Sequence, residues 1–342
     1  MKNTLVLAKR MLLSGRRKAG LPYKMTFAAT YRCNLRCEIC GIWRRPHGEE
    51  MAVGEIRKMM SGMRGLSWID LTGGEISVRE DVADIAGVIM DSAPGLAVFH
   101  VSTNGQMPER IFLLAGEIIK RGLAPVINVS VDGPPRVNDL LRGVEGSYYR
   151  SLETFRMLKA LKKGHYYLSC TISKYNIDYL EELITVLGKE PCFSPSDLHF
   201  NLFHASSHYY GNDQVEGNPG CDPDMIERFM SLAKKGNMIK RFLEDKYITG
   251  LRRYLNGDRF PVACQAFNGS LFINPYGDIY PCGMYDRCIG NIRNYGYDMS
   301  LLWDSSLAGR VRDDIRGRMC PGCWSPCEAY PSIIANAGRV RA

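Results

Sequence analysis

The segment KMTFAATYRCNLRCEIC, residues 24–40, joins an apolar run typical of a buried strand to three cysteines within eight residues. Cys33, Cys37 and Cys40 follow a C-x3-C-x2-C spacing, and no histidine lies beside them. A structural zinc site uses four ligands, commonly as two close pairs, so this cluster is one ligand short. A redox pair at Cys37 and Cys40 would leave Cys33 unexplained. The third alternative is a [4Fe–4S] cluster held by three thiolates, which leaves one iron open to a substrate or cofactor.

Apolar runs alternate with helical patterns from residue 25 to residue 203. The runs are residues 24–31, 66–74, 96–105, 124–133, 165–173 and 196–203; helical patterns lie near residues 55–64, 80–91, 108–121, 147–163 and 176–188. This alternation predicts a parallel sheet whose strands are buried on both faces. A closed barrel needs eight such units, so six predict an α/β fold with a partial (β/α)6 TIM-like barrel, residues 25–203. Three strands end in the glycine turns TGG, TNG and VDGPP, at the edge where such sheets carry their chemistry.

The N-terminal segment, residues 1–24, predicts a basic amphipathic helix with Leu5, Ala8, Leu12 and Leu13 on its apolar side. We expect this side to pack on the protein body. The alternative is that residues 1–20 contact an anionic membrane surface.

Residues 204–259 are predicted to form a loop followed by linker helices. The polar, glycine-rich stretch 204–222 is expected to be a mobile cover over the barrel mouth. A helix is expected after Asp222, with Pro223 in its first turn, running towards Arg253. Residues 260–342 predict a small cysteine-rich α+β domain that opens with a hairpin turning at NPYGD.

The composition is that of an ordinary globular protein and gives no sign of nucleic-acid binding. Of 342 residues, 45% are hydrophobic and 23% are charged, which is ordinary for a globular protein. The net charge of +8 is spread along the chain without a basic run interleaved with aromatics, so no nucleic-acid partner is expected. Twelve cysteines without a secretion signal favour reduced thiols and a cytoplasmic location, with the inner membrane face as the alternative if the first helix binds lipid.

Two further motifs at strand ends resemble those of a known protein family. Gly73-Gly74-Glu75 follows the second strand, and SVDG at residues 130–133 ends the fourth. Together with the C-x3-C-x2-C loop, they resemble the radical S-adenosylmethionine (SAM) superfamily over nearly the whole chain. The resemblance implies that SAM chelates the open iron of a [4Fe–4S] cluster held by the three cysteines. An electron from the cluster then cleaves the sulfonium bond, and the resulting 5′-deoxyadenosyl radical abstracts a substrate hydrogen.

The same resemblance implies a set of SAM-binding residues. The turn at Gly73, Gly74 and Glu75 should receive the methionine ammonium group. Ser130 and Arg142 resemble the pair that anaerobic sulfatase-maturating enzymes use on SAM, although a surface ion pair is the plainer interpretation of Arg142. Asn104 would face the ribose of SAM; the alternative is that it only forms a turn. Ile39 stands where the family often has an aromatic beside the adenine, and an aliphatic side chain can still pack there.

A second group of cysteines lies near the C-terminus. Cys264 and Cys282, with the C-x2-C-x3-C run of Cys320, Cys323 and Cys327, resemble the SPASM/twitch region of the same superfamily. A full SPASM domain has at least seven cysteines in a longer pattern, so the resemblance implies one auxiliary [4Fe–4S] cluster. Its ligands would be Cys264, Cys282, Cys320 and Cys323, with Cys327 spare or a substitute. A zinc site is the alternative to this cluster. Of the remaining cysteines, Cys288 is a weaker candidate ligand, and three are expected to be isolated thiols: Cys170, Cys192 and Cys221.

The resemblance predicts a radical SAM enzyme that oxidises or modifies a peptide or protein residue, with the auxiliary cluster as electron acceptor. A small molecule or lipid substrate is the alternative, and an iron–sulfur electron carrier without SAM turnover is the remote one. A flavodoxin- or ferredoxin-type protein would supply electrons. Acid–base candidates in the cover loop are His204, His208, Tyr209 and Tyr210, each expected to be structural more often than catalytic.

Overall fold

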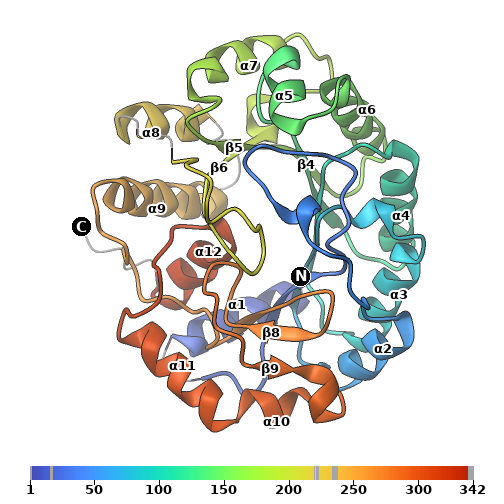
Figure 1. Cartoon of the computed structure of the whole chain (residues 1–342), viewed down its shortest axis with the longest axis vertical. Helices are drawn as coiled ribbons and strands as arrows, with labels where there is room; N and C mark the ends of the chain where they lie inside the picture. The colour runs from blue at the N-terminus through green and yellow to red at the C-terminus, as the bar shows by residue number, and fades with distance from the viewer. Residues whose placement is uncertain (1, 16–17, 219, 221–222, 233–237, 338–342) are drawn as a thin grey trace.

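The computed structural model describes residues 2–15, 18–218, 220, 223–232 and 238–337 (Figure 1). Its centre is one sheet with strand order β6-β5-β4-β3-β2-β1-β7-β8-β9. The first six strands pair in parallel, each with the next along the chain. They are β1 (Lys24–Ala28), β2 (Trp68–Thr72), β3 (Val98–Thr103), β4 (Pro125–Ser130), β5 (His165–Ile172) and β6 (Leu198–Leu202). The predicted partial barrel is confirmed.

Helices cover the outer face of these strands and form the rim of the molecule in Figure 1. They are α2 (Val53–Ser61), α3 (Val82–Ser92), α4 (Pro108–Lys120), α6 (Ser147–Ala160) and α7 (Leu180–Leu187). Helix α4 shows why they dock there. It starts at Pro108, which fits the first helical turn, and buries Ile111, Leu114, Ala115 and Ile118 at three- and four-residue spacing.

Shorter elements lie between the predicted ones. Helix α5 (Pro135–Arg142) was not expected from the sequence, and the described residues also contain five single turns of 3₁₀ helix. These turns are η1 (Ile42–Arg44), η2 (Ile76–Val78), η3 (Ile177–Tyr179), η4 (Pro195–Asp197) and η5 (Ile292–Tyr295).

The inner face of the barrel differs from the prediction of strands that are apolar on both sides. Alternate residues on β3 to β6 are polar and line an internal cavity: His100 and Ser102, Asn128 and Ser130, Ser169 and Thr171, and His199 and Asn201. The opposite residues, such as Val101 and Ile127, are fully buried under the helices. The strands are therefore amphipathic around a hollow interior.

The cysteine-rich region continues the barrel sheet. Strand β7 (Ser270–Ile273) pairs in parallel with β1, and β8 (Asp278–Tyr280) and β9 (Gly290–Asn291) extend it as antiparallel strands. The predicted hairpin at NPYGD is the β7–β8 connection. Helices α10 (Met299–Trp303), α11 (Ser306–Arg316) and α12 (Pro326–Ala335) complete this region. Between it and β6 lie α8 (Pro223–Leu232) and α9 (Met238–Leu255), in the region where the sequence predicted a helix from Asp222 towards Arg253; residues 233–237 lie outside the described ranges.

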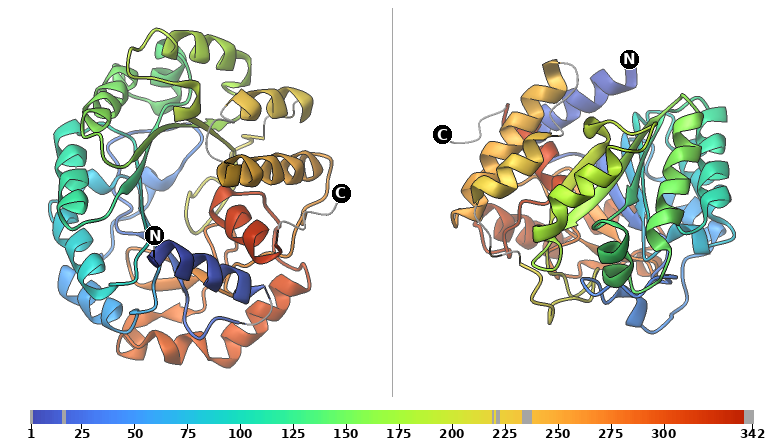
Figure 2. Two further views of the ribbon diagram at one scale, coloured as in Figure 1. Left: turned by 180° about the vertical axis from the view of Figure 1, so that it is seen from behind. Right: turned by 90° about the horizontal axis from the view of Figure 1, so that it is seen from above.

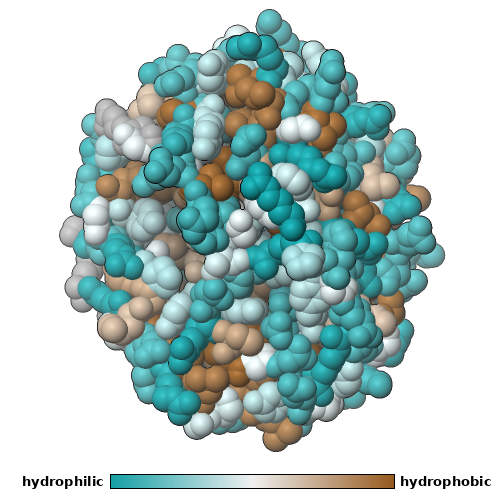
Figure 3. Space-filling view, in the orientation of Figure 1, coloured by the Kyte–Doolittle hydropathy of each residue, from teal (hydrophilic) through white to brown (hydrophobic). Residues whose placement is uncertain are grey.

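Helix α1 (Lys2–Ser14) crosses the back of the molecule beside α12 (Figure 2). Its packed side chains are Leu7 and Met11, which contact Tyr23. The predicted apolar side is wrong, because Leu5 is 70% exposed and Leu12 is 47% exposed. None of the helices in the described ranges is long and apolar enough to cross a lipid bilayer. The face shown in Figure 3 is mostly hydrophilic, with apolar side chains in small separate groups.

An ion pair ties the barrel to the C-terminal region. Glu55 on α2 accepts hydrogen bonds from Arg293 Nε at 2.7 Å and Tyr297 Oη at 2.7 Å. Hydrogen bonds from Arg293, then from Tyr297, lower the pKa of Glu55 to about 2 against some desolvation. The carboxylate therefore stays ionised at neutral pH and holds two segments that are far apart in sequence.

We expect Glu55→Gln to lower the free energy of unfolding by about 1–3 kcal/mol, because it removes a charge-assisted hydrogen-bond acceptor. Anaerobic urea unfolding followed by tryptophan fluorescence measures this. The matched control is Glu117→Gln, which removes a solvent-screened pair with Arg121 on α4 and should leave the unfolding midpoint nearly unchanged. Equal midpoints for the two variants would contradict the assignment of Glu55 as a tie.

Candidate active site and second cysteine site

The carboxyl ends of the barrel strands open into a cavity of about 440 Å³. Its walls come from β2 to β6, the loop after β1, the segment that follows β6, helix α9 and the start of α12. In parallel α/β sheets this end of the strands carries the catalytic groups. The cavity is therefore the candidate active site.

The three cysteines of the first loop line this cavity together. Two backbone hydrogen bonds hold the loop against the end of α5: Arg36 N donates to Arg142 O at 3.0 Å, and Glu38 N donates to Leu141 O at 2.9 Å. The loop is thus fixed by backbone contacts, while two of its thiols make long contacts, from Cys40 Sγ to Tyr210 O at 3.7 Å and from Asn104 Nδ2 to Cys33 Sγ at 3.8 Å.

The surroundings of these thiols test whether they fit an iron–sulfur cluster. Burial raises the pKa of Cys33 to about 11 and of Cys40 to about 12, and it also raises the pKa of Cys37. They stay neutral at physiological pH unless a bound metal supplies positive charge, as iron does for thiolate ligands. Within the described ranges, no three His, Cys, Asp or Glu side chains are gathered closely enough to hold one metal ion. A cubane cluster spreads its ligands over separate irons, so three thiols along one wall fit it.

The predicted glycine turn lies at the cavity wall. A Cβ atom on Gly73 would stand 2.4 Å from Thr30 O, and one on Gly74 would stand 2.5 Å from Arg32 O. Only glycine allows the end of β2 to approach the loop after β1 this closely. Gly73 and Gly74 line the cavity as predicted.

Glu75 makes its hydrogen bonds within the protein. Its carboxylate is buried and accepts hydrogen bonds from Ser77 N at 3.0 Å, Thr103 Oγ1 at 2.8 Å and Asn104 N at 2.6 Å. Its side chain is not part of the cavity wall. It therefore holds the ends of β2 and β3 together, and its contact with the SAM ammonium group stays a prediction.

Arg142 supplies positive charge to the cavity wall beside Cys37. Its Nη2 lies 2.6 Å from Asp132 Oδ2, and its buried Nε has no hydrogen-bond partner. Ser130 lines the same wall. A guanidinium group with an unused donor is suited to a carboxylate ligand, so the predicted pair has the required chemistry. Asp132, which orients Arg142, was not singled out from the sequence.

Two other predicted SAM contacts also line the cavity. Ile39 does so from the cysteine loop. Asn104 lines it as well, but its Nδ2 donates to Asn34 Oδ1 at 2.8 Å and its Oδ1 accepts from Gln106 N at 3.0 Å. Both ends of this amide are used within the protein, which favours the turn-forming role.

The segment predicted as a cover packs on the cysteine loop. Tyr210 O accepts a hydrogen bond from Gly41 N at 2.8 Å, and Asn212 Nδ2 donates to Ile39 O at 2.9 Å. Tyr209 Oη and Thr72 Oγ1 share a hydrogen bond of 2.8 Å. Tyr209 and Tyr210 both line the cavity, their rings stacked at 4.3 Å. Burial raises the pKa of each tyrosine above its ordinary value, so both remain protonated.

The two histidine candidates differ in position. Burial lowers the pKa of both His204 and His208 to about 4, so both are neutral at physiological pH. His204 lines the barrel cavity. His208 does not; its Nε2 lies 3.0 Å from Cys282 O and its ring stacks on Tyr280. The position of His208 is that of a structural residue.

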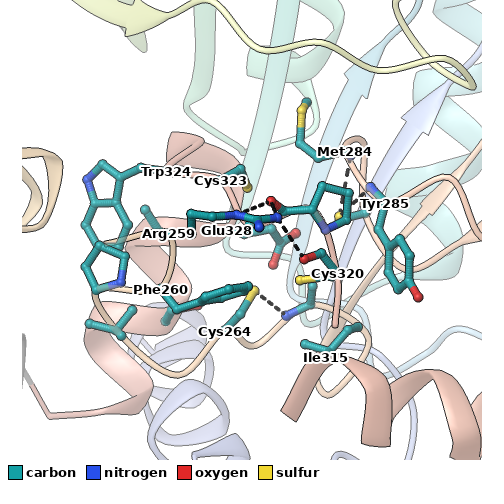
Figure 4. A pocket seen from close by; sticks show the side chains of 18 residues that line it. Arg259, Phe260, Cys264, Met284, Tyr285, Ile315, Cys320, Cys323, Trp324 and Glu328 are labelled. Carbon is teal, nitrogen blue, oxygen red and sulfur yellow. Dashed lines mark hydrogen bonds between the residues drawn. The ribbon is translucent and has the colours of Figure 1, made fainter. Parts of the chain in front are cut away.

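Four C-terminal cysteines line a second, smaller cavity (Figure 4): Cys264, Cys282, Cys320 and Cys323. Burial raises the pKa of Cys264, Cys282 and Cys323, so these thiols too need a cation in order to ionise. Cys327 is separate from them, because it lines the barrel cavity. Pro326 starts α12, and Cys327 is the next residue along the helix. This position favours Cys327 as the spare thiol, and its role as a ligand stays a prediction.

The remaining cysteines lie elsewhere. Cys288 is exposed and lines neither cavity. Cys170 is buried beside Asn176, and Cys192 is partly buried. Cys221 lies outside the described residues. All eleven cysteines that the structure describes are free thiols.

The polar floor of the barrel cavity was not predicted from the sequence. It consists of Trp68, Asp70 and His100, with Lys24 buried behind Asp70. The signal was present, because Asp70 and His100 each interrupt an apolar run at the third position of a strand, with the period of two that marks one face.

Comparison with known proteins agrees with this geometry. A family model described as the radical SAM superfamily matches residues 28–187, and one described as the SPASM iron–sulfur cluster-binding domain matches residues 264–327. The chain is 23% identical over 335 residues to the antilisterial bacteriocin subtilosin biosynthesis protein AlbA of Bacillus subtilis, covering 91% of this chain and 69% of AlbA. It is also 23% identical over 337 residues to the AdoMet-dependent heme synthase of Methanosarcina barkeri, covering 88% and 91%.

Solved structures share the fold. Streptococcus suis SuiB bound to S-adenosylmethionine superposes with a TM-score of 0.60 at 14% identity, covering 86% of this chain and 68% of SuiB. SuiB bound to its precursor peptide SuiA gives a TM-score of 0.59.

The two cysteine sites predict distinct iron losses. Anaerobically reconstituted protein should hold about eight irons per chain, as two [4Fe–4S] clusters require. The Cys33→Ala/Cys37→Ala/Cys40→Ala variant should keep about four, and Cys264→Ala should lose the other cluster. Cys327→Ala should keep about eight, like the control Cys170→Ala, because its thiol faces the barrel cavity. Iron loss in Cys327→Ala, or zinc in place of four irons, would contradict the assignment.

Proposed function

Because the chain belongs to the radical SAM superfamily and carries a SPASM domain, we propose that it uses SAM to oxidise or modify a residue of a peptide or protein. The observation that carries this proposal is one cavity lined by three thiols and by Arg142 with an unused donor. When bound, the cluster and SAM supply a 5′-deoxyadenosyl radical that removes a hydrogen atom from the substrate.

The chain's own residues would bind the cluster and SAM, orient SAM, and shield the reacting groups from water. Cys33, Cys37 and Cys40 would hold the cluster. Arg142, oriented by Asp132, would bind the SAM carboxylate, and Ser130 would donate a hydrogen bond beside it. Stacked Tyr209 and Tyr210 close the cavity next to the cysteine loop and exclude water from the reacting groups.

The SPASM region would accept the electron that the substrate radical loses. Its four thiols are buried or partly buried, and a cluster bound by all four has no open iron for substrate, which suits electron transfer. A flavodoxin- or ferredoxin-type partner would supply the first electron, and the net charge of +8 favours an acidic donor. Reduced thiols and a flavodoxin-type partner support a cytoplasmic location.

Relatives support two kinds of substrate. AlbA takes part in the biosynthesis of a bacteriocin, and SuiB binds a precursor peptide. This favours a peptide. The AdoMet-dependent heme synthase, of which the match covers 91%, favours a small molecule as the second candidate.

SAM cleavage tests the function without a known substrate. Anaerobic protein given SAM and dithionite should yield 5′-deoxyadenosine and methionine, and the triple Cys→Ala variant should yield neither. Two deuterated probes then separate the substrate classes: short peptides encoded beside the gene, and a peptide-free metabolite extract. Deuterium should enter 5′-deoxyadenosine from the peptides. Transfer from the extract alone would favour the second candidate, and undiminished cleavage in the triple variant would contradict the function.

Helix α1 also supports a proposal of peripheral membrane contact. Its outer side exposes Leu5, Val6 and Leu12 together with Lys2 and Lys9. Apolar side chains flanked by lysines suit an anionic lipid surface, because burial of the leucines and attraction to the head groups act together.

Liposome flotation tests this proposal. The protein should float with phosphatidylglycerol vesicles and remain behind with phosphatidylcholine vesicles. Leu5→Glu/Leu12→Glu should abolish flotation, whereas Leu113→Glu/Leu301→Glu, at leucines that are 68% and 58% exposed elsewhere, should not. Equal flotation of both double variants would show that α1 is not the membrane contact.

A further inference from the structure

A carboxylate lies against the auxiliary cysteines. Glu328, in the first turn of α12, lines the same small cavity as Cys264, Cys282 and Cys323 (Figure 4) and is 6% exposed. A [4Fe–4S] cluster with four thiolates is already anionic, so a further negative charge beside it raises the free energy of the site unless a cation compensates.

That cation is Lys24, whose side chain is fully buried at the start of β1. Its Nζ lies 3.6 Å from Glu328 Oε1 and 3.0 Å from Asp70 Oδ2, and it donates to Cys327 O at 2.7 Å. Burial by itself would lower the pKa of Lys24, but the charges of Asp70 and Glu328 outweigh it and raise the pKa. The ammonium group therefore stays charged between two carboxylates. Burial raises the pKa of Glu328, and Lys24 and a hydrogen bond from Ser270 oppose this rise.

The second carboxylate belongs to the other site. Asp70 lines the floor of the barrel cavity with Trp68 and His100. Its Oδ1 accepts from Trp68 Nε1 at 2.7 Å and lies 3.2 Å from His100 Nδ1. Lys24 thus stands between the two cavities, with one carboxylate towards each.

We propose that Glu328, Lys24 and Asp70 form a buried charge bridge that sets the reduction potential of the auxiliary cluster and makes it respond to charge at the floor of the barrel cavity. This rests on the proposed function, in which that cluster takes the substrate's electron. Lys24 and Asp70 are positioning residues, because they act on the cluster through Glu328 and through their charge.

The sign of each effect follows from electrostatics. Reduction adds negative charge to the cluster, so a nearby anion disfavours the reduced form and a nearby cation favours it. Glu328→Gln removes the nearer anion and raises the potential. Asp70→Asn removes the farther anion, leaves Lys24 opposite Glu328 alone, and raises the potential by less.

Redox titrations monitored by electron paramagnetic resonance (EPR) at fixed pH test the bridge on the reconstituted full chain. Glu328→Gln should raise the equilibrium constant for reduction of the auxiliary cluster at least tenfold, which is about 59 mV for a one-electron couple. Asp70→Asn should shift it in the same direction by less. The control Asp197→Asn removes a buried carboxylate, paired with Lys159 at 3.0 Å, that lines neither cavity, and should leave the potential unchanged.

The outcomes separate the bridge from the proposed function. The bridge is overturned if the potential shifts in Glu328→Gln but not in Asp70→Asn, or if it shifts in neither variant. These results leave the assignment of the two clusters unaffected. If Glu328→Gln fails to load iron, Asp70→Asn decides alone, since Asp70 lies outside the auxiliary site. A wild-type chain with about four irons and one EPR signal overturns the bridge together with the electron-accepting role of the SPASM region.

Discussion

Two backbone hydrogen bonds between the cysteine loop and the end of α5 position most of the active site. They run from Arg36 N to Arg142 O and from Glu38 N to Leu141 O. Gly143 makes the approach possible, because its φ is +68° and a Cβ there would stand 2.7 Å from Arg36 O. The same contact that holds the three thiols therefore fixes Arg142 beside Cys37. The three thiols proposed as cluster ligands and the guanidinium proposed for the SAM carboxylate are placed by the fold itself.

Much of this arrangement could be predicted from local sequence. Each of the six strands was predicted because it is an apolar run that alternates with helical patterns, and the C-x3-C-x2-C loop was placed correctly because it directly follows β1. Local patterns failed where packing decides. Leu5 and Leu12 of α1 form an apolar stripe, yet Leu7 and Met11 face the protein. Local patterns also did not predict the hydrogen bonds of Glu75 with Ser77 and the end of β3.

Long-range pairing explains what the sequence could not indicate. Lys24 and Glu328 meet only because β7 pairs with β1 and brings α12 behind the barrel. No local motif predicts that a lysine in an apolar strand will neutralise a carboxylate beside the second cysteine site. Likewise, the spacing of Cys320, Cys323 and Cys327 suggests one group, but the start of α12 turns Cys327 into the other cavity. The sheet that joins the two regions thus also couples their charges.

We propose above all that Cys33, Cys37 and Cys40 hold a cluster with one iron open to SAM. The most direct measurement is the EPR spectrum of the reduced, oxygen-free chain before and after SAM is added. We expect the signal that is lost in the triple Cys→Ala variant to change when SAM binds, and the auxiliary signal to stay the same. A spectrum in which SAM leaves the first signal unaltered would contradict this proposal.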